Sequence, residues 1–209
     1  MEPTRIGVLI SGGGTNLQAI MDNIKDGNIN GKIELIISNK ENAYGLVRGR
    51  KANIDTLYLD RKQFKREEEY NLELVKNFKE KNVQLIILAG YLRVLSKDFI
   101  QEFSGRIINI HPSLIPSFCG KGFYGERVHK AVLDYGVKIT GATVHFVDEG
   151  TDTGPIILQE AVKVEDRDNL DTLKEKVLEV EHKILVQAVK LYCENRLSIE
   201  GRKVIIKWE

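Results

Sequence analysis

Hydrophobic and polar positions in the first half of the chain follow two patterns in turn. Short, largely apolar runs predict buried strands, and apolar residues that repeat every three or four positions predict amphipathic helices. The expected strands are residues 5–11, 33–38, 55–59, 85–88 and 106–110. The expected helices lie around residues 17–24, 44–52, 66–81 and 96–103, the last with Ser96 as its N-cap. This alternation predicts an α/β fold with a mostly parallel, doubly wound (Rossmann-like) sheet flanked by helices.

The pattern changes after residue 111. Residues 112–125 contain Pro, Ser, Gly and Lys and predict a long loop. The elements expected beyond it are a helix at 128–135, strands at 139–147 and 155–164, a helix at 173–191, and a strand at 203–208 that belongs to a hairpin. The two strands predict an antiparallel extension of the sheet toward the C-terminus. No linker or repeat is evident, so we expect a single domain over 1–209, with halves at 1–105 and 106–209.

Composition and charge restrict the classes of partner. Among 209 residues, 31 Lys and Arg nearly balance 30 Asp and Glu, so the net charge of +1 gives no electrostatic reason to expect nucleic acid or a membrane surface as a partner. The first apolar run is too short for a secretion signal, and no stretch is long enough to span a bilayer. Cys119 and Cys193 lie far apart without a CxxC partner, which favours a reducing compartment. We therefore expect a cytoplasmic protein.

A glycine loop follows the first expected strand and opens the first helix. In Gly12-Gly13-Gly14-Thr15-Asn16, backbone N–H groups at a helix start can bind an anion such as phosphate. The loop lacks the Lys of a P-loop and the third small residue of a dinucleotide fingerprint. A phosphate site is the favoured interpretation, a tight turn without ligand is the main alternative, and a nicotinamide nucleotide site is the least favoured.

Polar residues also end the fifth expected strand. Asn109 and His111 are two positions apart, so on a strand both side chains point to the same side, and Pro112 ends the strand behind them. The carboxyl edge of an open α/β sheet is where ligands bind. The alternative is structural: an Asn that caps a turn and a His bonded to a backbone carbonyl.

An acidic segment, residues 148–154, joins two expected strands. Its alternative interpretation is a solvated turn. A carboxylate from this segment, however, could reach the imidazole at the same sheet edge and hold its tautomer. Asn, His and a carboxylate together suit attack of an amine on a carbonyl carbon, because two donors stabilise the oxyanion and the carboxylate helps to move the amine proton. Neither Ser113 nor Cys119 has an evident activating base, so we expect direct transfer rather than a covalent acyl-enzyme.

Other polar residues have weaker signals. His129 and His182 fall on expected helices and His145 on an expected strand, and none has the spacing of a metal ligand set, so no metal is expected. Glu181 interrupts an apolar helix flank, where a solvated side chain is the ordinary interpretation. Arg93 follows the carboxyl end of another strand and could line a pocket.

Five segments occur in an order shared with a known family. They are Ser11-Gly-Gly-Gly-Thr-Asn-Leu-Gln-Ala-Ile20, Ser38-Asn-Lys40, Leu88-Ala-Gly-Tyr-Leu-Arg-Val-Leu95, Asn109-Ile-His-Pro-Ser-Leu-Ile-Pro116 and Gly141-Ala-Thr-Val-His-Phe-Val-Asp-Glu-Gly-Thr-Asp-Thr-Gly-Pro155. In this combination, over nearly its whole length, the chain resembles the phosphoribosylglycinamide formyltransferases (glycinamide ribonucleotide transformylases), which are folate-dependent formyltransferases. The resemblance implies transfer of a formyl group from 10-formyltetrahydrofolate, as cosubstrate, to the amine of 5'-phosphoribosylglycinamide in purine biosynthesis.

The resemblance also implies roles for single residues. The first half would bind phosphate and nucleotide, and the second would bind folate and catalyse. By matching motifs, the catalytic trio would be Asn109, His111 and Asp152, with His145 as a supporting histidine. The substrate phosphate would bind to Gly14, Thr15 and Asn16, and the acid that holds the ribose would be Glu181. The folate pocket would be formed by Arg93, Leu95, Val147, Asp148 and Glu149. The implied partners are these small molecules, without nucleic acid or membrane, and the implied assembly is a monomer or homodimer.

The segment 117–126 departs from the commoner family pattern, and His129 is the candidate for the histidine that the family has near this loop. The nearest rival is a formyltetrahydrofolate hydrolase, which usually has an extra N-terminal domain, whereas this chain starts at its first strand. Methionyl-tRNA formyltransferase shares the core but adds a C-terminal domain and needs a basic surface. A non-catalytic nucleotide-binding module predicts that Asn109, His111 and Asp152 do not meet.

Overall fold

A computed structural model describes residues 2–207 of the chain, which divides into two compact units, one up to Ile108 and one from Asn109 onward. The elements of the first unit are β1 (Thr4–Ile10), α1 (Thr15–Lys25), β2 (Gly31–Ser38), α2 (Tyr44–Lys51), β3 (Thr56–Tyr58), η1 (Arg61–Gln63), α3 (Glu67–Glu80), β4 (Leu85–Leu88) and α4 (Lys97–Glu102). Strand β5 (Ile107–His111) starts there and continues into the second unit. The single-domain expectation, with halves at 1–105 and 106–209, stays a prediction.

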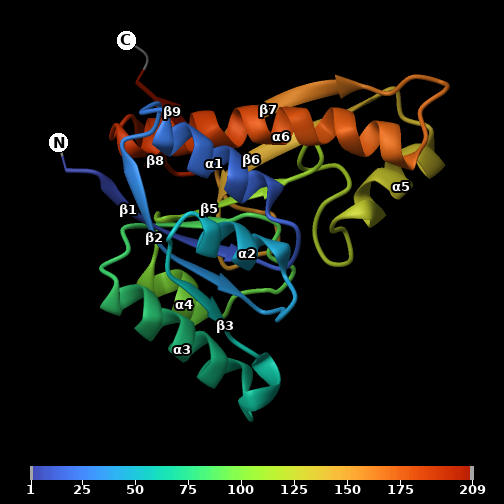
Figure 1. Cartoon of the computed structure of the whole chain (residues 1–209). Coiled ribbons are helices and arrows are strands. Elements are labelled where there is room, and N and C mark those ends of the chain that lie inside the picture. Colours follow the sequence, from blue (N-terminus) through green and yellow to red (C-terminus); the bar gives the residue numbers. More distant parts are fainter. Residues whose placement is uncertain (1, 208–209) are drawn as a thin grey trace. The chain divides into compact units, whose positions relative to one another are not determined.

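The strands of the first unit lie in the order β3-β2-β1-β4, and the three pairs are parallel. The apolar runs form strands because both faces of the sheet are covered: Val8 and Leu9 of β1 and Ile87 of β4 have no exposed surface. Helix α1 contacts α2, and α3 contacts α4, as Figure 1 shows in blue to green. The predicted parallel α/β arrangement is confirmed in this unit.

Helix α4 shows how local sequence sets an element boundary. Ser96 precedes the helix with extended backbone, and its hydroxyl accepts a hydrogen bond from the Phe99 N–H at 3.2 Å. This satisfies one of the N–H groups that a helix start leaves without an intrahelical acceptor. The predicted N-cap is therefore confirmed.

The second unit continues with α5 (Glu126–Tyr135), β6 (Ile139–Phe146), β7 (Ile156–Lys163), α6 (Leu170–Cys193), β8 (Leu197–Glu200) and β9 (Lys203–Ile206). Strands β6 and β7 pair antiparallel, and α6 packs against both (Figure 1). The expected antiparallel extension is confirmed, and β8 and β9 form the expected hairpin.

Some boundaries differ from the expectations. Strand β5 extends through His111, one residue beyond the predicted end, so His111 is the last strand residue. Strand β9 ends at Ile206, and Trp208, expected in this strand, lies outside the described residues. The short helix η1 was not predicted, because three residues with a local Asp60 side-chain cap leave no periodic pattern. Across residues 2–207, no helix combines the length and apolarity needed to cross a bilayer.

Candidate active site

The second unit brings four predicted side chains into one cluster. The Asn109 amide nitrogen lies 3.0 Å from Nε2 of His145. Nδ1 of His111 lies 3.6 Å from Oδ2 of Asp152, and Nε2 of His145 lies 3.8 Å from Oδ1 of the same carboxylate. Three separate elements supply these groups: β5, β6 and the loop between β6 and β7. The meeting of Asn109, His111 and Asp152 removes the basis for the non-catalytic alternative, which required them to lie apart.

His145 orients the Asn109 amide. Its Nδ1 lies 2.8 Å from the carbonyl oxygen of Phe146, and because a carbonyl only accepts, Nδ1 is the donor. Burial lowers the pKa of His145, against the opposing effects of this hydrogen bond and of Asp152. In the neutral ring, Nε2 then accepts from the amide nitrogen of Asn109. One N–H of that amide is thereby used and the second is left to meet a ligand.

Asp152 sits in a loop whose shape is held from several sides. Its backbone has φ of 57°, a left-handed conformation that aspartate tolerates better than most residues. Asp148 accepts hydrogen bonds from the Gly150 N–H at 3.1 Å and from the Thr153 hydroxyl at 2.6 Å. Arg202 in the β8–β9 turn donates to the Thr153 carbonyl at 3.0 Å. The solvated-turn interpretation is wrong for the Asp152 side chain, which is 12% exposed.

The loop after β5 folds back on the cluster. Nε2 of His111 donates to the Phe118 carbonyl at 3.0 Å, and the Ser113 hydroxyl donates to the Ser117 carbonyl at 2.6 Å. The Gly120 N–H donates to Oδ2 of Asp152 at 2.8 Å. Backbone groups of residues 117–120 therefore occupy hydrogen-bonding positions on two candidate catalytic side chains.

His129 lies on α5, is buried, and has no hydrogen-bond partner for Nδ1 among residues 2–207. Burial lowers its pKa to about 4, with a further contribution from Lys174 that Glu126 opposes. His111 contributes in the same direction, so the two rings are electrostatic neighbours. The ring is neutral in the folded protein at neutral pH.

We expect His129 to make folding stability depend on pH below about 6.5. The folded pKa of about 4 lies below the ordinary value of 6.5, so the unfolded chain binds the proton first as the pH falls. The free energy of unfolding is unaffected above the ordinary pKa and decreases between pH 6.5 and 4, by at most roughly 1.4 kcal/mol per pH unit. Urea unfolding at several pH values should show a shallower decrease for His129→Phe than for the wild type. If the free energy of unfolding decreases equally with falling pH in both proteins, His129 is not the group responsible.

In the first unit, the glycine loop stands at the start of α1 as expected. Gly14 is the N-cap residue, with φ of 70°. Within residues 2–207, no side-chain hydrogen bond caps the start of this helix. A Cβ on Gly14 would lie 2.8 Å from the Cα of Gly45, so the loop packs too closely for a larger residue. Thr15 is exposed and Asn16 is buried. The first backbone N–H groups of α1 thus have no side-chain cap, and the phosphate site at this helix start stays a prediction.

Arg48 is a neighbour of this loop that sequence reasoning missed. Its Nε donates to the Gly13 carbonyl at 2.9 Å, and its Nη1 donates to Gln18 at 2.9 Å. The residue falls inside an expected helix and has no motif around it. Only the fold brings it to the loop.

The remaining predicted residues lie partly in the first unit and partly in the second. Arg93 and Leu95 line an open pocket of about 410 Å³ in the first unit, together with Glu67, Leu92, Val94 and Ser96. In the second unit, Glu181 lies on the buried side of α6, so its interpretation as a solvated side chain is wrong. Val147 and Asp148 follow β6 and are half-buried, whereas Glu149 is exposed.

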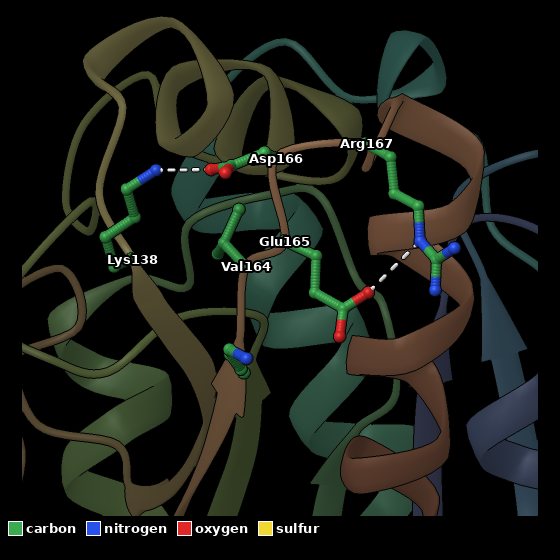
Figure 2. A pocket seen from close by; sticks show the side chains of 6 residues that line it. Lys138, Val164, Glu165, Asp166 and Arg167 are labelled. Atoms are coloured by element: carbon green, nitrogen blue, oxygen red, sulfur yellow. Dashed lines mark hydrogen bonds and ion pairs between the residues drawn. The ribbon is translucent and has the colours of Figure 1, made fainter.

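A second open pocket, of about 560 Å³, contains none of the predicted residues. Its lining includes Lys138, Val164, Glu165, Asp166 and Arg167. Figure 2 shows two ion pairs in this lining: Lys138 with Asp166 at 2.6 Å, and Arg167 with Glu165 at 3.4 Å. Throughout residues 2–207, no group of three or more His, Cys, Asp or Glu side chains is arranged to hold a metal ion.

A comparison with known protein families identifies the family of this chain. The family model described as formyl transferase matches residues 4–189. The chain belongs to the formyl transferase family.

Relatives of this formyl transferase include phosphoribosylglycinamide formyltransferases and trifunctional purine biosynthetic proteins. The chain is 41% identical over 202 residues to the chloroplastic phosphoribosylglycinamide formyltransferase of Arabidopsis thaliana, covering 94% of this chain and 68% of that protein. It is 42% identical over 205 residues to the trifunctional purine biosynthetic protein adenosine-3 of Gallus gallus, of which it spans only 20%. The crystal structure of glycinamide ribonucleotide transformylase 1 from Symbiobacterium toebii matches with a TM-score of 0.93 and 44% identity, covering 98% of this chain and 94% of that one.

The same formyl transferase fold also occurs in an enzyme with another name. A formyltetrahydrofolate deformylase from Pseudomonas syringae pv. tomato matches with a TM-score of 0.87 and 25% identity. The match covers 98% of this chain and 66% of that one. The fold alone therefore does not decide between an amine and water as the acceptor.

Proposed function

We propose that this formyl transferase moves the formyl group of 10-formyltetrahydrofolate to the amine of 5'-phosphoribosylglycinamide. The products are the N-formyl ribonucleotide and tetrahydrofolate, in de novo purine biosynthesis. The observation that supports this most is the cluster of Asn109, His111 and Asp152, joined by His145, within a formyl transferase fold. The names of two relatives favour the same acceptor, and the name of the deformylase contains the formyl-folate.

The cluster suits direct attack. The amine nitrogen forms a bond to the formyl carbon, and the carbonyl oxygen becomes an oxyanion. The second N–H of Asn109 and the N–H of His111 stabilise this negative charge, and such donors typically contribute about 10²–10³-fold in rate. The tetrahedral intermediate then expels N10 of tetrahydrofolate, which takes up a proton.

Asp152 is the group that accepts the amine proton. The attacking amine becomes cationic and must lose a proton, and a carboxylate within reach of the reacting atoms can accept it directly or through one water. The same carboxylate faces Nδ1 of His111 at 3.6 Å and so holds the ring in place. Before the formyl oxygen can take the hydrogen bond from Nε2 of His111, it must replace the Phe118 carbonyl.

Each unit contains residues to which we assign a part in substrate binding. We assign the substrate phosphate to Gly14, Thr15 and Asn16, supported by the uncapped start of α1, and the ribose to Glu181. We assign the folate to Arg93 and Leu95 and to the backbone of Val147, Asp148 and Glu149. The open pocket that Arg93 and Leu95 line supports the folate assignment. No step in this reaction needs a metal ion.

The competing function is hydrolysis of the same donor, which the likeness to the deformylase favours. Both reactions release tetrahydrofolate, so release by itself does not separate them. The two differ in the acceptor that attacks the formyl carbon.

Tetrahydrofolate release should depend on the amine. We expect release to be saturable in 5'-phosphoribosylglycinamide and to fall to background without it, because the amine is the attacking group in the proposed reaction. Steady-state absorbance measurements with and without the amine test this. The ribonucleotide with its amine already acetylated is the matched control and should not support release. Equal release in all three mixtures would overturn the transferase proposal in favour of the hydrolase.

A further inference from the structure

The pocket beside Arg93 contains an ion cluster that no expected role explains. Nη2 of Arg93 donates to both carboxylate oxygens of Glu67, at 2.9 and 2.8 Å. Nε of Arg61 donates to the same carboxylate at 2.6 Å. Glu67 thus occupies the position on Arg93 that a carboxylate of a ligand would take.

Several features hold Glu67 ionised there. Burial works against the charge, but the hydrogen bonds from Arg93 and Arg61 keep the pKa of Glu67 below its ordinary value. Glu67 is also the first residue of α3, where the helix dipole favours a negative charge. The carboxylate is therefore an ionised group in the lining of the pocket.

Arg93 has further binding capacity beside its ion pair with Glu67. Its guanidinium lies over the Tyr70 ring, 5.6 Å from the ring centre, and its Nε is buried without a hydrogen-bond partner among residues 2–207. Two arginines donate to this one glutamate, so displacement of Glu67 would free the guanidinium group of Arg93 for a ligand anion.

Apart from Ser96, the rest of the lining is apolar. Leu92 and Val94 are 53% and 69% exposed, which leaves both side chains available to cover an aromatic body. A ligand that satisfies both parts has an aromatic body and a carboxylate tail. The glutamate end of a folate has this chemistry.

We propose that Glu67 is a built-in competitor for the carboxylate tail of the bound folate and thereby sets the affinity of the pocket for anionic ligands. The inference rests on the proposed folate-binding role of this pocket. Tail binding must displace Glu67 from Arg93. The free energy needed to break that ion pair therefore makes the binding free energy of the tail less favourable. Removing the negative charge of Glu67 should therefore strengthen binding of tails that contain carboxylates and leave neutral tails unaffected.

The test compares two variants and two probes. Glu67→Gln keeps the shape and removes the charge, and Glu68→Gln removes the same charge from the next residue of α3, which does not line the pocket. The probes are N-(4-aminobenzoyl)glutamate and the same compound with both glutamate carboxylates as amides. Kd values come from calorimetric or ligand-observed NMR titration. We expect Glu67→Gln to bind the dicarboxylate about three- to tenfold more tightly, with no change for the diamide or in Glu68→Gln.

Two outcomes would overturn the proposal. Unchanged or weaker dicarboxylate binding by Glu67→Gln would mean that Glu67 positions Arg93 rather than competing for it. Equal gains for both probes would mean that the change is not directed at the carboxylates. In the transfer assay, the same variant should lower KM for 10-formyltetrahydrofolate at unchanged kcat. A wild type without transfer activity would reject the proposed function, while the fragment titration would still report on Glu67.

Discussion

Asp152→Asn is expected to lower kcat by roughly 10²–10³-fold or more, because it removes both the acceptor for the amine proton and the carboxylate beside Nδ1 of His111. His111→Ala should have an effect of the same order, since it deletes one donor to the oxyanion. The two losses should be far from additive, as expected for groups that act on one transition state. Single-turnover measurements with saturating donor isolate the chemical step.

Asp166→Asn is the matched control for this experiment. Asp166 is an exposed aspartate of the same unit, paired with Lys138 at the surface and outside the cluster. Its turnover should stay near that of the wild type. Near-normal single turnover in either Asp152→Asn or His111→Ala would reject the roles assigned to these side chains.

Gly154→Ala should disable the same site through the backbone. A Cβ on Gly154 would clash with the carbonyl oxygen of Phe146, and this backbone contact cannot be relieved without moving the loop. Overpacking of this kind costs about 1–3 kcal/mol, and displacing a catalytic group by about 1 Å can cost about 10²-fold in rate. Because Asp152 is two residues away, we expect kcat to fall by about 10²-fold in a protein that still folds.

Gly150→Ala provides the comparison within the same loop. There the added Cβ would meet mainly the Thr153 side chain, which can rotate away at the expense of its bond to Asp148. Thermal unfolding and kcat should both change less than in Gly154→Ala. If the two variants behave alike, the close approach of Gly154 to Phe146 does not hold Asp152 in place.

Sequence periodicity predicted the scaffold of the site well, for a physical reason. Strand β5 is buried, so its apolar pattern is unmistakable, and the two-residue repeat of a strand puts Asn109 and His111 on one side. The acidic segment was located because turn residues interrupt two strands. The contact between Asp152 and His111, however, depends on a left-handed backbone and on a loop fold that periodicity does not describe.

Other contacts had no signal in the sequence. The Phe118 carbonyl on His111 belongs to a loop without periodic pattern, and any residue at 118 would have supplied the same carbonyl. Glu67 lies in an acidic first turn, which ordinarily indicates nothing beyond a favourable helix start. Its pairing with Arg93 joins residues 26 positions apart and exists only in the folded unit.

The fate of the formyl carbon tests the central claim most directly. With ¹³C-labelled 10-formyltetrahydrofolate and 5'-phosphoribosylglycinamide, ¹³C NMR of the reaction should show the label in a formamide attached to the ribonucleotide, in amounts equal to the tetrahydrofolate released. Label that appears as free formate, at the same rate with and without the ribonucleotide amine, would contradict the proposed transfer.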